Sequence, residues 1–184
     1  MTSFPLYLMR HGAPAVPGRL LGRTDCPATA EGIAACRAQA DALGPLRLVS
    51  SDRTRARACA EAIGTPVLDP RWRELDFGAW DGLAPADVDP HALGRFWEDP
   101  DAFPPPGGER WSALAARVGE AIAALAPEPT LVVTHGGAMR AALHRLCGFG
   151  VAELFAFELP HAAVLALTVW QGEPRRGQIA GLWP

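Results

Sequence analysis

The sequence contains no lysine and no asparagine, and every one of its 17 basic residues is arginine. Without lysine the chain cannot form a Schiff base with a carbonyl substrate and cannot carry a P-loop lysine. The absence is typical of the composition bias of a GC-rich genome. Its chemical consequence is that any anion site must use arginine, histidine or backbone amides. Arginine suits phosphate, because its planar guanidinium makes paired, charge-assisted hydrogen bonds.

Long apolar runs and clustered cysteines are also missing. No apolar stretch is long enough to span a bilayer, and the N-terminal stretch has no charge before Arg10, unlike a secretory signal peptide. We therefore expect a cytoplasmic protein. The formal net charge of −3 gives no reason to expect binding to nucleic acid or to a membrane. The four cysteines, Cys26, Cys36, Cys59 and Cys147, are scattered along the chain. A disulfide framework or a zinc site would show clustered or regular spacing, so we expect free buried thiols.

Strand and helix patterns alternate along the 184 residues, a length that suits one domain. The alternation predicts an α/β fold, a single three-layer domain over 1–184 with a mostly parallel central sheet flanked by helices. We expect an irregular, cap-like segment at about 71–108, with one or two short helices near Pro85 and His91. The expected strands are 4–9, 46–49, 67–68, 131–134 and an antiparallel pair at 163–170 and 177–182. The expected helices are 29–43, 109–125, 136–146 and one that follows capping residues at Ser50, Ser51 and Asp52 and runs to about Ile63.

Three polar clusters follow expected strands: Arg10-His11-Gly12, residues 50–57, and Thr134-His135-Gly136. Ligands of such sheets bind beyond the carboxyl ends of the strands, so we expect the three clusters to meet at one edge. A neutral imidazole is a competent nucleophile towards phosphorus. Neighbouring arginines disfavour the protonated form of His11 and help to keep it neutral.

Each candidate has a simpler interpretation when it is taken alone. A lone histidine such as His11 is more often structural than catalytic, and His135 is compatible with a surface loop as well as with an anion site at a helix N-terminus. Arg53, Arg55 and Arg57 alternate along one helix and cannot all face one site. We interpret Arg53 and Arg57 as solvated surface residues.

Glu74 lies in the segment RWRELDFGAWDG, among three aromatic residues. Partial desolvation there would make it a plausible general acid. The alternative is an ordinary ion pair with Arg71 or Arg73. The aromatic residues of this part of the chain have two interpretations, a wall for a flat base or packing onto the sheet, and packing is favoured for Trp80, Trp97, Phe103 and Trp111.

Five motifs occur in an order that resembles the histidine phosphatase superfamily, also called the phosphoglycerate mutase-like superfamily. The resemblance spans roughly residues 6–145. The Arg-His-Gly triplet alone is a weak signal, and the ordered set is a strong one. The motifs are LYLMRHG, SSDRTRARACA, RWRELDFGAWDG, PPGGERW and LVVTHGGAMRAAL.

The resemblance implies a role for each matching residue. His11 would attack the phosphoryl group and become phosphohistidine, and Glu74 would protonate the leaving alkoxide and later activate water. Glu109 resembles a supporting acid with a structural role. The implied catalytic residues are Arg10, His11, Arg55, Glu74 and His135. The implied phosphate-binding and substrate-binding residues are Arg10, Gly22, Arg23, Arg55, His135 and Gly136.

The implied reaction is metal-independent hydrolysis of a phosphomonoester of a small metabolite, with no cofactor. The loop PGRLLGRTDCPAT resembles the α-ribazole phosphatase branch, which makes α-ribazole 5′-phosphate one candidate substrate. In this loop Arg23 would either add charge to the pocket or pair with Asp25. The alternatives are a phosphoglycerate mutase-type isomerase and a non-catalytic binding relative. The compact segment between Glu74 and His135 and the short stretch after His135 favour hydrolysis, and a homodimer is one of the oligomeric states left open.

Overall fold

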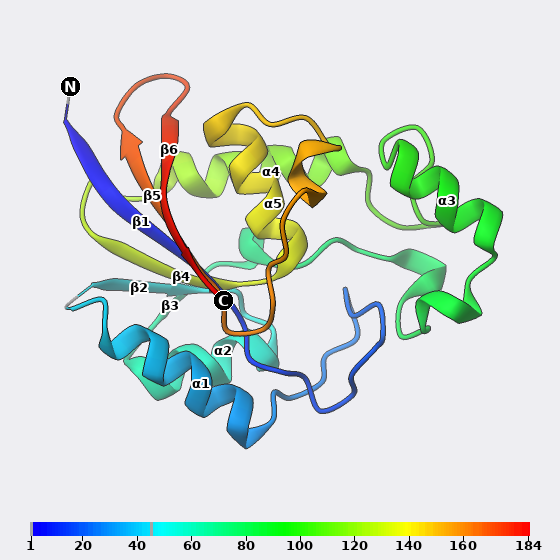
Figure 1. Ribbon diagram of the computed structural model, residues 1–184, viewed down its shortest axis with the longest axis horizontal. Coiled ribbons are helices and arrows are strands. Elements are labelled where there is room, and N and C mark those ends of the chain that lie inside the picture. The colour runs from blue at the N-terminus through cyan, green and yellow to red at the C-terminus, as the bar shows by residue number, and fades with distance from the viewer. Residues whose placement is uncertain (1, 45) are drawn as a thin grey trace.

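A six-stranded sheet of order β3-β2-β4-β1-β5-β6 forms the centre of the computed structural model, which describes residues 2–44 and 46–184 (Figure 1). The pairs β3/β2, β2/β4 and β4/β1 are parallel, and β1/β5 and β5/β6 are antiparallel. The predicted mostly parallel sheet and the predicted late antiparallel pair are therefore confirmed. The strands are β1 (Ser3–Arg10), β2 (Arg47–Ser50), β3 (Val67–Leu68), β4 (Thr130–Thr134), β5 (Val164–Trp170) and β6 (Arg176–Trp183).

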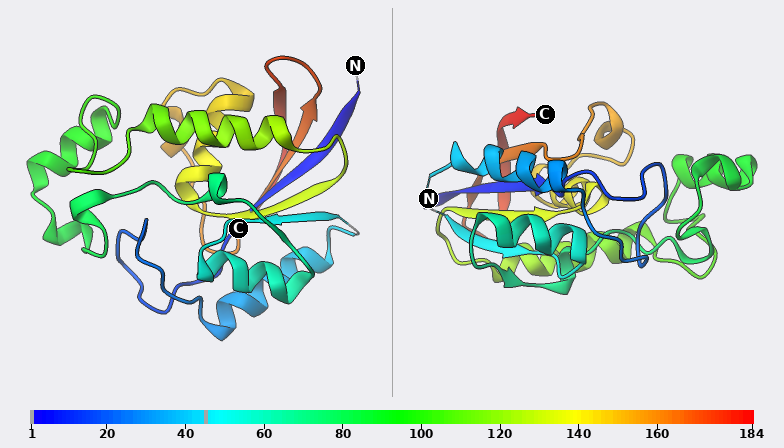
Figure 2. Two further views of the ribbon diagram at one scale, coloured as in Figure 1. Left: turned by 180° about the vertical axis from the view of Figure 1, so that it is seen from behind. Right: turned by 90° about the horizontal axis from the view of Figure 1, so that it is seen from below.

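Helices cover both faces of the sheet and make the three layers of the predicted α/β fold (Figures 1 and 2). Successive side chains of a strand point to opposite faces. On β1, Leu6 and Leu8 join the apolar core beneath α4 and α5, whereas Met9 joins the core beneath α1 and α2. The covering helices are α1 (Ala30–Asp41) and α2 (Thr54–Ile63) on one face, and α4 (Trp111–Ala124) and α5 (Gly136–Cys147) on the other.

The segment that leaves β3 is anchored by Trp72, whose side chain is fully buried in the core beneath α4 and α5. Replacing a buried tryptophan by alanine would cost about 3–5 kcal/mol of unfolding free energy. Because Trp72 is fixed, the residues that directly follow it are held against the sheet. The anchor lies in the first of the three short 3-10 helices between β3 and α3, which are Pro70–Trp72, Gly78–Trp80 and Pro85–Asp87.

The predicted short helix near His91 is α3 (Pro90–Glu98), which lies to one side of the sheet (Figures 1 and 2). It begins where the Asp89 carboxylate accepts a hydrogen bond from the amide of Ala92 at 2.8 Å. Pro90 occupies the first helical position, where no backbone donor is needed. Phe96 is buried and meets Trp80 edge to face, with ring centroids 5.7 Å apart. This contact holds the cap-like segment together.

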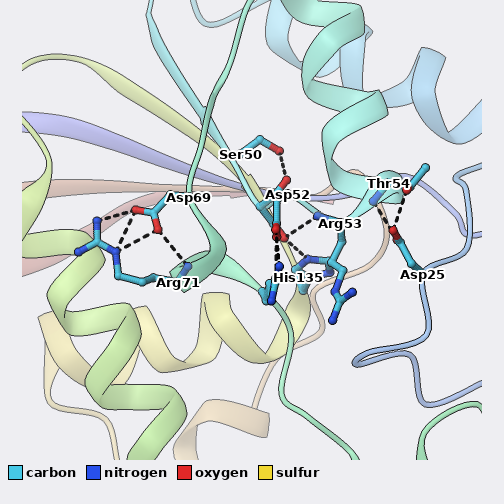
Figure 3. Close-up of polar contacts among 10 residues, drawn as sticks. Asp25, Ser50, Asp52, Arg53, Thr54, Asp69, Arg71 and His135 are labelled. Atoms are coloured by element: carbon cyan, nitrogen blue, oxygen red, sulfur yellow. Dashed lines mark hydrogen bonds and ion pairs between the residues drawn. The ribbon is translucent and has the colours of Figure 1, made fainter.

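The start of α2 differs from the prediction. The helix begins at Thr54, and Arg53 at the N-cap makes no side-chain capping bond. The cap comes from the loop before α1, where the Asp25 carboxylate accepts hydrogen bonds from the Thr54 amide at 2.9 Å and its hydroxyl at 2.8 Å (Figure 3). Ser51 and Asp52 are therefore free to make other contacts.

The four cysteines are free thiols, as predicted, and Cys147 is the one that is only partly buried. Among the described residues, no helix is both long and apolar enough to cross a membrane.

Candidate active site

The carboxyl ends of β1, β4 and β2 bring the predicted clusters to one edge of the sheet. Arg10 pairs with Thr134 across β1 and β4, and Ser50 pairs with Val133 across β2 and β4. The residues that follow these strand ends are therefore neighbours. The ring centroids of His11 and His135 lie 5.0 Å apart, edge to face.

The protonation of the His11 ring follows from its two partners. Nδ1 lies 2.7 Å from the carbonyl oxygen of Gly12. A carbonyl can only accept, so Nδ1 carries the proton. In the neutral ring Nε2 then holds a lone pair, and it accepts a hydrogen bond from Nε of Arg55 at 3.2 Å. Nε2 is thus the nucleophilic atom of this tautomer.

The surroundings keep this ring neutral. His11 is 5% exposed. Burial first, then the positive charge of Arg55, lowers the pKa of His11 well below its usual value, and Arg10 and His161 act in the same direction. A neutral imidazole at neutral pH retains the lone pair that attack on phosphorus requires.

His135 is completely buried at the N-cap of α5, and its two ring nitrogens differ in their partners. Nε2 lies 2.9 Å from the hydroxyl oxygen of Ser51, which also accepts a hydrogen bond from the amide of Arg53 at 3.4 Å. When Ser51 donates to Nε2, the ring proton lies on Nδ1, and Nδ1 has no partner among the described residues. Burial, followed by the proximity of His11, lowers the pKa of His135 well below its usual value.

Arg10 places a second buried donor beside His11. Its Nη1 donates to the carbonyl of Leu159 at 2.6 Å, whereas its Nε has no acceptor within the described residues. A Cβ added at Gly136 would lie 3.6 Å from this Nε, so the guanidinium lies against the first residue of α5. Burial lowers the pKa of Arg10, and the negative charge of Glu74 opposes that shift. Buried donors without acceptors are costly, and phosphoryl oxygens would satisfy them.

Arg55 joins the site to the loop that precedes α1. Its side chain is completely buried, and Nη1 and Nη2 donate to the carbonyls of Thr24 at 3.1 Å and Leu21 at 2.5 Å. Its Nε is the donor that reaches His11. Burial lowers the pKa of Arg55, and Glu74 opposes this shift. Arg55 therefore supplies fixed positive charge and also holds the loop in place.

Glu74 lies at the N-terminus of α5, at the rim of the same site. One carboxylate oxygen accepts from the amide of Gly137 at 3.1 Å and the other from the amide of Leu75 at 2.8 Å. A Cβ at Gly137 would lie 2.1 Å from the Glu74 carboxylate, so this approach requires glycine. The Gly137 amide is therefore used to position the acid.

The alternative interpretation of Glu74 as an ordinary ion-pair partner is wrong, because the two neighbouring arginines pair elsewhere: Arg71 with Asp69, and Arg73 with Asp52. Arg117 instead fixes the backbone of this segment, donating to the Glu74 carbonyl at 2.9 Å and to Glu109 at 2.7 Å. Glu109 also accepts a hydrogen bond from the amide of Asp76 at 3.3 Å, so its carboxylate supports the backbone of the segment that carries Glu74.

Sequence reasoning missed His161, which lines the cleft of about 380 Å³ beside His11. The two imidazole centroids lie 5.4 Å apart. The turn that places His161 is strained, since Ala162 adopts a φ of 66° while its amide donates to the carbonyl of Arg10 at 3.1 Å. Partial burial and then Arg10 lower the pKa of His161 to about 4. The pairing of β1 with β5 brings His161 to the cleft beside His11. The residues around it in the sequence form no motif that predicts this position.

Gly22 and Arg23 do not line this cleft but a neighbouring cavity that also touches Glu74. The Asp81 carboxylate accepts hydrogen bonds from the amides of Gly22 at 3.0 Å and of Arg23 at 2.5 Å, so these loop donors are used within the protein. The Arg23 guanidinium pairs with Asp76 at 3.0 Å and not with Asp25. The loop therefore supports Arg55 rather than offering its amides to phosphate.

The two neighbouring arginines, Arg53 at the N-cap of α2 and Arg57 within the helix, behave differently from each other. Arg57 is exposed and pairs with Glu61 one helical turn away, as expected of a solvated surface. Arg53 is half-buried, and its Nε has no acceptor in the described part of the chain, so its interpretation as a solvated surface residue is wrong. Within 2–44 and 46–184, no three His, Cys, Asp or Glu side chains form a group suited to a metal ion.

Comparisons with known proteins agree with this geometry. The family model of the histidine phosphatase superfamily (branch 1) matches residues 6–179. A glucosyl-3-phosphoglycerate phosphatase of Mycobacterium tuberculosis is 34% identical over 168 residues, covering 77% of this chain and 75% of that protein. A metal-independent phosphoserine phosphatase of Arabidopsis thaliana is 31% identical over 165 residues, covering 77% and 68%. The crystal structure of a phosphoglycerate mutase from Thermus thermophilus is 38% identical, covers 98% of both chains and has a TM-score of 0.77.

Proposed function

The chain belongs to the histidine phosphatase superfamily (branch 1), and we propose that it hydrolyses the phosphomonoester of a small metabolite through a phosphohistidine on His11. One observation carries the proposal. Nε2 of a neutral, buried His11 accepts a hydrogen bond from Arg55, the His135 ring lies edge to face with the His11 ring, and Arg10 lines the same cleft. Arg10 and His135 each hold a buried donor without an acceptor among the described residues. Such a site offers a nucleophile and unpaired donors to an anionic phosphoryl group.

In the first step the lone pair of His11 Nε2 attacks phosphorus. A nitrogen–phosphorus bond forms while the phosphorus–oxygen bond to the alcohol breaks, and Glu74, which must carry a proton in the substrate complex, donates that proton to the departing oxygen. Arg55 Nε exchanges its hydrogen bond with Nε2 for one with a phosphoryl oxygen. Arg10 and the Nδ1 proton of His135 bind the other oxygens, where negative charge accumulates.

In the second step water attacks the phosphohistidine from the side that the alcohol has left. Glu74, now ionised, takes a proton from this water as the new phosphorus–oxygen bond forms. The nitrogen–phosphorus bond breaks, its electron pair returns to Nε2, and inorganic phosphate leaves. The enzyme ends with its starting protonation.

Metal-independent catalysis is part of the proposal. The arginines beside His11 supply the positive charge that a metal ion supplies in many phosphoryl-transfer enzymes. The name of the Arabidopsis relative, a metal-independent phosphoserine phosphatase, supports the same mode of action.

The substrate class that we propose is a small phosphorylated metabolite. The relatives are named for a glucosyl-3-phosphoglycerate, a phosphoserine and a phosphoglycerate reaction, and these names share a small phosphorylated metabolite. α-Ribazole 5′-phosphate remains a candidate, from the resemblance of the loop at 17–29. A mutase reaction is the second candidate, favoured by the name of the Thermus thermophilus structure.

The test is phosphate release from p-nitrophenyl phosphate by the wild type and by His11→Ala, each with and without a chelator. We expect wild-type activity in both conditions and none in His11→Ala. His91→Ala is the matched control, because His91 is an exposed histidine of α3 and should leave the rate unchanged. Loss of wild-type activity with chelator would contradict the metal-free mechanism, and full activity of His11→Ala would contradict the nucleophile.

The same preparation separates hydrolysis from isomerisation. Incubated with 3-phosphoglycerate, a phosphatase releases inorganic phosphate, whereas a mutase forms 2-phosphoglycerate without net release. Isomerisation faster than phosphate release would replace the proposed hydrolysis by the mutase reaction.

A further inference from the structure

A second cavity, of about 160 Å³, adjoins the cleft beside His11. The two share wall residues, namely Arg10, Glu74 and Phe77. The remaining wall of the second cavity is mostly apolar. Its aromatic members come from α3, from the start of α4 and from the turn after α5, and they are Phe96, Trp97, Trp111 and Phe155.

The position of Glu74 decides what this cavity can hold. A general acid must lie within hydrogen-bond reach of the oxygen that leaves. With phosphorus beside His11 and the leaving oxygen at Glu74, the rest of the alcohol extends beyond Glu74. The cavity that shares both Arg10 and Glu74 with the cleft is therefore placed to receive the leaving group.

A third cavity also touches Glu74, but it is less suited to this role. It is lined by several charged residues and shares only Glu74 with the other two. Three of its four arginines already form ion pairs within the protein, and a polar or anionic leaving group would compete with those carboxylates. The pairs are Arg23–Asp76, Arg73–Asp52 and Arg117–Glu109. The fourth, Arg53, has no acceptor for its Nε in the described part of the chain, but this cavity does not share Arg10 with the cleft beside His11.

The aromatic cavity matches an uncharged ring in size and chemistry. An engineered apolar cavity of about 150 Å³ accommodates benzene, so about 160 Å³ holds one six-membered ring. At its rim Trp97 and Phe155 meet edge to face, with centroids 5.1 Å apart, and they are 48% and 44% exposed. A bound ring would cover part of this exposed apolar surface.

The one arginine confined to this cavity packs against its aromatic wall. Arg140 lies over the ring of Phe155, with its guanidinium carbon 4.7 Å from the ring centroid. Its Nε also donates to the carbonyl of Leu154 at 3.1 Å. These two contacts hold the Arg140 side chain against the turn that carries Phe155.

We propose that this cavity is the leaving-group subsite, and that the preferred substrates are phosphomonoesters of alcohols that carry an uncharged aromatic ring near the esterified oxygen. This inference rests on the proposed function, since it takes phosphorus to lie beside His11. It departs from the polyhydroxylated and anionic leaving groups in the names of the phosphoglycerate-type relatives.

The sequence named four aromatic residues as a wall for a flat group and favoured packing for them all. In the structure, two of the four line the cavity and two do not. Trp97 and Trp111 line the cavity. Trp80 packs in the core against Phe96, and Phe103 lies outside with Arg95 over its ring at 5.0 Å.

The experiment compares kcat/KM for benzyl phosphate and glycerol 3-phosphate, which both release unactivated alkoxides. If the subsite did not exist, kcat/KM should be similar for benzyl phosphate and for glycerol 3-phosphate. We expect the wild type to favour benzyl phosphate by about tenfold or more, and Trp97→Ala to reduce this ratio about three- to tenfold, the range expected for one aromatic contact. Phe103→Ala is the matched control, an equally exposed aromatic of the same segment outside the cavity, and it should leave the ratio unchanged.

Binding of benzylphosphonate and methylphosphonate, measured by calorimetry, separates the subsite from the chemistry. Tighter binding of benzylphosphonate in the wild type, lost in Trp97→Ala, supports the inference. Equal hydrolysis of both esters, or a ratio that Trp97→Ala leaves unchanged, overturns the inference and leaves the proposed function intact. If neither ester is hydrolysed and no phosphonate binds, the proposed function and the inference fail together.

Discussion

Arg55 donates a hydrogen bond through Nε to Nε2 of His11 at 3.2 Å, from a guanidinium with no exposed surface. The arginine faces the lone pair that attacks phosphorus, and its charge helps to lower the pKa of the ring. The same contact therefore holds the ring in its reactive tautomer and keeps a donor ready for the phosphoryl oxygens.

Replacing Arg55 by methionine should reduce both activity and stability. We expect kcat to fall about a hundredfold or more, because a fixed charge on the transferring group is lost. The carbonyls of Leu21 and Thr24 would lose their donor, at a cost of about 2–4 kcal/mol in unfolding free energy. Urea unfolding and steady-state kinetics measure the two effects. Arg57→Met, on the exposed face of the same helix, is the control, and an equal loss there would refute this role.

The two buried histidines predict how stability depends on pH. The pKa values of His11 and His135 are lowered by folding, so the unfolded chain, with pKa values of about 6.5, takes up protons first as the pH falls. The stability present above about pH 6.5 is lost progressively below it. The unfolding free energy should be lower at pH 5.5 than at pH 7.5, and His11→Gln should show a smaller difference. Equal stability of the wild type at both pH values would contradict the buried neutral state.

Gly137→Ala tests the placement of the general acid without removing it. The added Cβ would lie 2.1 Å from the Glu74 carboxylate, which is the flexible end of a side chain and can move away. We expect unfolding to change little, while kcat for an alkyl phosphate falls about tenfold. Turnover of p-nitrophenyl phosphate should fall less, because its leaving group needs little protonation. An equal loss for both substrates would argue against the acid role of Glu74.

Ser51→Ala removes the hydroxyl that contacts Nε2 of His135 and leaves the imidazole in place. Without this partner the proton is no longer directed to Nδ1, so we expect kcat to fall about tenfold, in line with the loss of one positioned hydrogen bond. Ser51→Thr keeps a hydroxyl and should restore most of the rate. Ser51 is a positioning residue in this account, and failure of the threonine to rescue would point to a packing role.

The sequence predicted the strands and helices well because their signals are local. β4 is a short apolar run that is buried throughout, and α5 begins directly after His135. The parallel order then brought Arg10, His11 and His135 to one edge. The cap of α2 was mistaken because Asp25, a residue 29 positions away from Thr54, provides it.

The rest of the site depends on contacts between distant segments. His161 reaches His11 through the β1/β5 pairing and a strained turn at Ala162. Asp81 takes the loop amides of Gly22 and Arg23, a contact that no local pattern in the loop reveals. In the sequence, Ser51 is indistinguishable from a serine that caps a helix. Only its distance to His135 in the structure shows that it contacts the histidine.

The most direct measurement is the detection of the covalent intermediate. The protein is mixed with a phosphomonoester, quenched with denaturant at alkaline pH, where phosphohistidine survives, and digested for mass spectrometry. We expect one phosphoryl group on the peptide that contains His11, formed and lost at rates that match turnover, and none in His11→Ala. Turnover with no phosphorylated His11, or a phosphoryl group on another residue at the turnover rate, would contradict the account.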